Sequence, residues 1–238
     1  AALDRTVPLH SGWNSAPEKH GKVMFPVTKG PEIASNVIHF LGDLGPIIGG
    51  TNHHNAIPIE RCEFVKSYYE GDEVPCMLVL VTDGVPDPVG LSSSAALDLL
   101  EARVNNFTND MGGKIFTWYL GGMPTLYEIT VELLQEDLDS GTLTATVSTI
   151  YNDYISTKQP IPSGSCAAWN AEKPADVPDC ATYNDTILPE HDEHVSNFNR
   201  FKSIMSGSND KVFIETEVIH TSSGTDLPPS FLAGLKEL

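Results

Sequence analysis

The sequence lacks any long apolar run, and basic residues are scarce. No segment approaches the roughly 18 consecutive apolar residues that a membrane-spanning helix needs, so we expect no membrane span within this chain. Only 14 lysines and arginines accompany 32 aspartates and glutamates among 238 residues, which gives a net charge of −18. A surface this acidic repels phosphate backbones and anionic lipid. We therefore expect no nucleic acid partner.

The common catalytic and metal motifs are also absent. There is no Cys-x-x-Cys pair for zinc, no Gly-x-Ser-x-Gly nucleophile turn, and no His-Glu-x-x-His protease motif. We therefore predict that the chain is not an enzyme. His191-Asp192-Glu193-His194 could place two histidines on one helix face as a ligand pair, although an exposed polar segment is the simpler interpretation.

The four cysteines form two pairs that are each 14 residues apart. Three connectivities are possible, but loop-closure entropy favours the local pairs Cys62–Cys76 and Cys166–Cys180. Disulfides form and persist in oxidising compartments. The pairing therefore favours a secreted or cell-surface protein.

Two N-glycosylation sequons, at Asn106 and Asn184, agree with an extracellular location. The chain begins with Ala1-Ala2-Leu3 and not with methionine. This start fits either a mature terminus after removal of a signal peptide or a fragment of a longer chain.

The segment from Met77 to Gly84 is the strongest strand signal. Its five apolar residues from Met77 to Val81 do not alternate with polar ones, which predicts a central strand of a parallel sheet with both faces buried. The strand ends at Asp83, on the edge where open α/β sheets bind ligands. An Asp-Gly turn without any ligand is the alternative interpretation.

The order of the predicted elements indicates a doubly wound, mostly parallel α/β sheet flanked by helices. We predict an irregular lead-in over 1–21, an α/β domain over 22–155, and a loop-rich extension over 156–238 that holds one disulfide and one strand. Residues 142–147 suit either a strand or the start of a helix. Other predicted elements are strands at 22–28, 114–120 and 211–220, and helices at 31–44, 52–68, 92–107, 124–134 and 191–204.

Three segments together resemble a von Willebrand factor type A domain: the glycine loop Gly49-Gly50-Thr51-Asn52, the strand at 78–84 that ends in Thr-Asp-Gly, and the strand at 115–122. The resemblance covers roughly residues 22–155, a span taken from the order of the elements. The first metal-site motif of that family, Asp-x-Ser-x-Ser, is not evident. The resemblance implies that the Thr51 hydroxyl and the Asp83 carboxylate hold Mg²⁺ or Ca²⁺ and leave a position for a carboxylate of a partner.

Three functions fit this sequence. The first is an extracellular protein-interaction or adhesion module that binds a protein partner, with or without a divalent cation. The second is a structural subunit of an extracellular assembly in which the metal site is degenerate. The third is a hydrolase whose site lies at the same sheet edge, around Asp83, Asp87 and His53.

Overall fold

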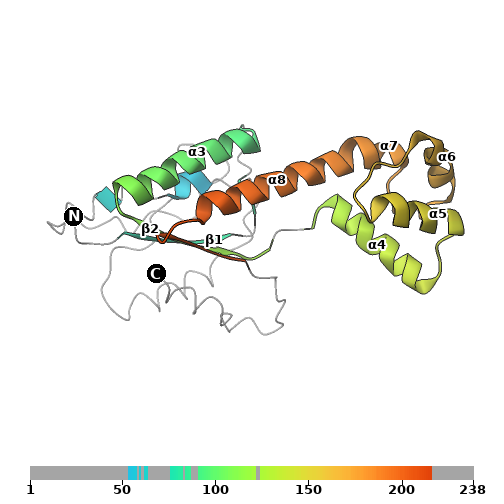
Figure 1. Cartoon of the computed structure of the whole chain (residues 1–238), viewed down its shortest axis with the longest axis horizontal. Coiled ribbons are helices and arrows are strands. Elements are labelled where there is room, and N and C mark those ends of the chain that lie inside the picture. The colour runs from blue at the N-terminus through green and yellow to red at the C-terminus, as the bar shows by residue number, and fades with distance from the viewer. Residues whose placement is uncertain are drawn as a thin grey trace, which may run out of the picture. The chain divides into compact units, whose positions relative to one another are not determined.

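In the computed structural model, the described residues are 53–57, 59, 62–63, 76–82, 84–86, 91–121 and 124–215. The chain divides into two compact units, whose elements are labelled in Figure 1. The sheet unit comprises residues 1–121 and 201–238, and the helical unit comprises residues 122–200. These units do not coincide with the predicted boundaries after residues 21 and 155. The predicted lead-in, 1–21, lies outside the described residues.

The sheet unit contains a three-stranded parallel sheet in the order β1-β2-β3. Met77 pairs with Lys114 at the start of β1 and β2, and Ile115 pairs with Lys211 at the start of β3. Parallel sense and strand positions agree with the sequence prediction. The strands are β1 (Met77–Thr82), β2 (Lys114–Tyr119) and β3 (Lys211–Glu215).

The prediction that β1 is buried on both faces is wrong. Met77, Val79 and Val81 are 50%, 42% and 49% exposed, whereas Thr82 is buried. The central strand of the described sheet is β2, where every residue from Ile115 to Tyr119 is buried. An unbroken apolar run indicates only that a segment can be buried. The strands and helices that pack around the segment determine which of its faces is buried.

Helix α3 (Ser93–Asn105) joins β1 to β2 and confirms the helix predicted there. The Ser92 side chain accepts a hydrogen bond from the Ala95 N–H and so caps the first turn. The π-helical turn η3 (Asn106–Asp110) follows, and Gly113 then lies so close to Phe107 that an added Cβ would approach the ring to 2.4 Å. Only glycine fits at this step into β2.

The helical unit begins with α4 (Leu126–Ser140), which the sequence predicts from residue 124 onward. Thr125 and Glu128 form a capping box at its start, and Gly141 ends it in the left-handed conformation with φ of 72°. Helix α5 (Ala145–Ile150) settles the ambiguous segment at 142–147 in favour of a helix. The remaining elements are η4 (Tyr151–Ile155), α6 (Ser163–Glu172), α7 (Cys180–Thr182), η5 (Tyr183–Ile187) and α8 (Leu188–Met205).

The segment predicted as a loop-rich extension is helical and well packed. Trp169 and Tyr183 are completely buried in a core that also holds Ile155 and Ile161. Four of the described prolines of this segment lie outside its helices, and Pro189 is the second residue of α8. Pro162 precedes α6 directly, and Pro174 follows its last turn, where proline commonly stands because it cannot continue a helix.

Two π-helical turns of the helical unit share the pattern Tyr-Asn-Asp-x-Ile, at Tyr151–Ile155 and Tyr183–Ile187. In both, the tyrosine and the isoleucine are buried. The Tyr151 hydroxyl donates to Gln135 Oε1 at 2.9 Å. The two turns therefore contribute matching apolar residues to one core. This short repeat is a signal that the sequence analysis missed.

Candidate functional site

The carboxyl end of β1 brings together two segments that are distant in sequence. The 3₁₀ turn η2 (His53–Ala56) places His53 Nε2 2.8 Å from Thr82 Oγ1, the side chain that ends β1. The imidazole ring also stacks on Phe201 of α8, with ring centroids 4.9 Å apart. Phe201 in turn meets Phe213 of β3 edge-on at 5.9 Å. His53 is therefore fixed by the strand, the helix and the sheet core.

The Thr82 hydroxyl has three polar neighbours at this edge. It lies 2.8 Å from His53 Nε2 and 3.2 Å from the Gly84 carbonyl oxygen, and the Gly84 N–H donates to it at 3.3 Å. The other ring nitrogen of His53, Nδ1, is buried and has no hydrogen-bond partner among the described residues. Burial, and then the neighbouring His54, lowers the pKa of His53 to about 4. His53 is thus neutral at physiological pH.

The two predicted metal ligands, Thr51 and Asp83, lie outside the described residues. The described neighbours on either side of them are His53, Thr82 and Gly84, which are hydrogen-bonded in series at the sheet edge. No group of three or more His, Cys, Asp or Glu side chains that could hold a metal ion occurs in the described part of the chain. His53 and Thr82, the described neighbours of the two predicted ligands, are therefore in contact at the carboxyl end of β1.

His191 does not form a ligand pair with His194, because both of its ring nitrogens have other partners. Nδ1 lies 2.9 Å from Thr125 Oγ1 at the start of α4, and Nε2 lies 2.9 Å from Lys158 Nζ. The ring also packs against Tyr127, with centroids 4.4 Å apart. His191 is only 2% exposed. This histidine joins α8, α4 and the turn after η4, and has no nitrogen left for a metal.

The protonation state of His191 follows from these contacts. Lys158 has no acceptor atom, so its ammonium donates to Nε2, and the Nδ1–H donates to Thr125. Burial, and then the positive charge of Lys158, lowers the pKa of His191. The sequence pattern Thr125-x-x-Glu128 predicts the cap of α4. No local pattern predicts its bond to His191, which is 66 residues away.

Both predicted disulfides are present. The Cα atoms are 5.8 Å apart in Cys62–Cys76 and 5.3 Å apart in Cys166–Cys180. Two disulfides are consistent with an extracellular protein. Within the part of the chain that the structure describes, no helix combines the length and the apolar character that a bilayer span requires.

The two sequons lie in different surroundings. Asn106 is exposed at the start of η3. Asn184 is partly buried, and its side-chain amide accepts from Ile161 N–H and donates to the Ile161 carbonyl, both at 2.8 Å. The same amide nitrogen also contacts Cys180 Sγ. A glycan on Asn184 would replace a hydrogen of the side-chain amide nitrogen that makes these contacts. A glycan on Asn106 would leave these contacts in place.

We expect Asn184→Asp to lower the free energy of unfolding by about 1–3 kcal/mol, because a carboxylate cannot donate to the Ile161 carbonyl and leaves that buried acceptor unpaired. Asn152→Asp is the matched control, since Asn152 holds the same place in the other Tyr-Asn-Asp-x-Ile turn but is exposed. Urea unfolding of both variants provides the measurement. Equal losses in the two variants would contradict the role assigned to Asn184.

No family model, no curated protein and no solved structure matches this chain.

Proposed function

We propose that this chain is an extracellular protein-interaction module that binds a protein partner at the carboxyl edge of its parallel sheet. The contact between His53 and Thr82 carries the proposal. Thr51 precedes His53 by two residues, and Asp83 directly follows Thr82. A 2.8 Å hydrogen bond joins His53 to Thr82 at the carboxyl end of β1, which supports the expectation that these two chain segments meet there. Open α/β sheets bind ligands at this edge.

A divalent cation is the second part of the proposal. A threonine hydroxyl and a carboxylate are oxygen donors, which hard cations such as Mg²⁺ and Ca²⁺ prefer. The Thr82 hydroxyl is already used by His53 and Gly84, so Thr51 and Asp83 are the residues that would hold the ion. The bound cation would supply a positive charge with coordination positions open to a partner's carboxylate. A doubly wound sheet, with helices on both faces, is the architecture we expect around it.

We expect about 10 mM Ca²⁺ or Mg²⁺ to raise the free energy of unfolding by about 1–3 kcal/mol over the protein in EDTA. This range follows from mass action with a dissociation constant of about 10⁻⁴–10⁻³ M, which is typical of extracellular calcium modules. Thermal unfolding with each cation and with EDTA checks it. Asp83→Asn should abolish the increase, because the amide keeps the size of the carboxylate but not its charge.

Asp110→Asn is the matched control for this experiment. Asp110 is exposed at the end of η3, just before β2 begins, and so lies toward the amino edge of the sheet. Its loss removes one carboxylate and should leave the effect of the cation unchanged. If no divalent cation shifts the unfolding midpoint, the metal part of the proposal is wrong and the structural-subunit interpretation is favoured.

A further inference from the structure

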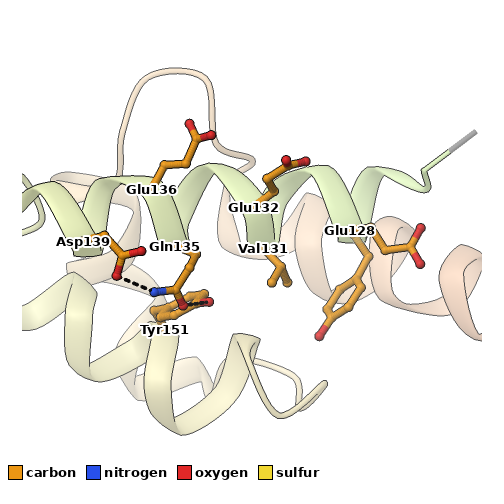
Figure 2. Close-up of a pocket in the computed structure, with 8 residues that line it drawn as sticks. Glu128, Val131, Glu132, Gln135, Glu136, Asp139 and Tyr151 are labelled. Atoms are coloured by element: carbon orange, nitrogen blue, oxygen red, sulfur yellow. Dashed lines mark hydrogen bonds between the residues drawn. The ribbon is translucent and has the colours of Figure 1, made fainter. Parts of the chain in front are cut away.

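A groove runs along α4 in the helical unit, separate from the sheet edge. Its cavity volume is about 440 Å³, and it is open to solvent. Figure 2 shows side chains of α4 on one side of it and Tyr151 on the other. Tyr127 and Tyr151 are 4% and 3% exposed, so their rings belong to the packed core and present only an edge to the groove. With Val131 they form an apolar floor.

The rim of the groove is acidic. Glu128, Glu132, Glu136 and Asp139 all line it. Their spacing of four, four and three residues places them along one face of α4, over about 16 Å at 1.5 Å per residue. In Figure 2 the carboxylates of Glu132 and Glu136 extend away from the floor and toward solvent. The groove therefore combines an apolar floor with a negatively charged rim.

One polar side chain of the groove is held in a fixed orientation. Gln135 accepts a hydrogen bond from the Tyr151 hydroxyl at 2.9 Å and donates to Asp139 Oδ1 at 2.8 Å (Figure 2). Its amide therefore links the floor to the rim. Both of these bonds lie within the helical unit.

Basic side chains are few in the helical unit. Residues 122–200 contain 13 acidic and three basic side chains. Lys158 donates to His191 and lies over the Tyr127 ring, while Lys173 donates to the Pro174 and Val177 carbonyls. None of the described residues that line the groove is basic. The unit therefore has ten more acidic than basic side chains, and the groove carries four of these acidic side chains beside its apolar floor.

We propose that this groove binds a lysine- or arginine-bearing segment of a partner protein. The methylene stem of such a side chain packs on apolar surface while its charged end stays among polar groups. Val131 and the groove-facing edges of the two tyrosines supply that surface, and the carboxylates of the rim attract the charge. Nucleic acids and anionic lipids would be repelled. A single metal ion fits less well, because the described carboxylates do not form a cluster of three that could hold one.

This surface is independent of the proposed cation site. The groove lies wholly within the helical unit, and Thr51 and Asp83 belong to the sheet unit. The experiment can therefore be carried out in EDTA, where the sheet-edge cation is absent. A negative result at the groove then leaves the proposed function untouched, and failure of the cation test leaves the groove untouched.

The test uses the full chain and a fluorescein-labelled peptide in which four arginines alternate with alanines, followed by fluorescence anisotropy at low salt with EDTA. We expect measurable binding, and about three- to tenfold weaker binding to the double variant Glu132→Gln, Glu136→Gln, because exposed charge pairs each contribute modestly. The control double variant Glu190→Gln, Glu193→Gln removes two exposed charges of α8 that do not line the groove, and should bind within about twofold of wild type.

Three outcomes would overturn the proposal. Equal weakening in the two double variants would mean that the peptide responds only to net charge. Absence of binding at low salt would mean that the groove does not recognise basic side chains. Finally, without EDTA, competition by Ca²⁺ that depends on Glu132 and Glu136 would assign the groove to a metal ion and not to a protein segment.

Discussion

Replacing Trp169 by alanine is expected to lower the free energy of unfolding of the helical unit by about 3–5 kcal/mol. Trp169 is completely buried, and its indole N–H donates to the Pro178 carbonyl at 3.0 Å. The alanine variant loses the buried ring, leaves a cavity in the core, and removes the donor from a partly buried carbonyl. These losses add, because each concerns atoms that the folded unit keeps away from water.

Urea unfolding followed by far-ultraviolet circular dichroism measures this loss, since the variant lacks the tryptophan whose fluorescence reports on the helical unit. Trp169→Phe is the matched variant. It keeps an aromatic ring in the core but not the donor to Pro178, so it should cost clearly less than the alanine variant. A loss below about 1 kcal/mol for Trp169→Ala would mean that α6 does not pack into the core as described.

Acidification from pH 6.5 to pH 4 is expected to destabilise the sheet unit by about 3 kcal/mol through His53 alone. Its pKa is about 4 in the folded chain and 6.5 in the unfolded chain, so the unfolded chain takes up the proton first. The stabilisation is complete above pH 6.5 and is lost as the pH falls toward 4. Each unit of pKa difference corresponds to about 1.36 kcal/mol, which gives this magnitude.

His53→Gln isolates this contribution. Glutamine can still donate to Thr82 but does not titrate, so the stability gap between variant and wild type should shrink by about 3 kcal/mol between pH 7 and pH 4. Urea unfolding across this pH range measures the gap. Parallel curves for His53→Gln and wild type would contradict the burial of His53.

The buried histidine of the helical unit, His191, also lowers the stability of the fold as the pH falls. The pKa of His191 is lowered by burial and by Lys158, so its protonation also favours the unfolded chain as the pH falls. A protonated His191 would face the Lys158 ammonium at 2.9 Å and could no longer accept its hydrogen bond. The two histidines therefore make both units sensitive to acid, each through its own contacts.

Local sequence patterns predicted much of the fold. The apolar runs gave the positions of the three strands, and the alternation with helices gave their parallel sense. Any of Ser92, Ser93 and Ser94 can cap the predicted helix from the sequence alone, and the structure shows that Ser92 caps α3. The short separation within each cysteine pair predicted both disulfides, because short loops close at the lowest entropic cost. Each of these features depends on residues that are near one another along the chain.

The same patterns failed where several short helices follow one another. Residues 158–184 contain prolines at intervals too short for a long helical period, and we predicted a loop there. In the structure these prolines lie before α6 and between α6 and α7, and η5 follows α7 directly. These elements are too brief to show a clear apolar stripe. Trp169 and Tyr183 stabilise them by burial in a shared core and not by local preference. Tertiary packing therefore determined the helical unit.

By itself the sequence determined the strands, the longer helices, the disulfide pairs and the excess of negative charge. Tertiary structure decided which strand is buried, because the exposed fraction of β1 and β2 depends on neighbours distant in sequence. Tertiary structure also decided the hydrogen-bond partners of the two buried histidines. Thr82 is 29 residues from His53 along the chain, and Lys158 is 33 residues from His191. A histidine's pKa and hydrogen bonds depend on what surrounds the ring in space, and no local spacing encodes that.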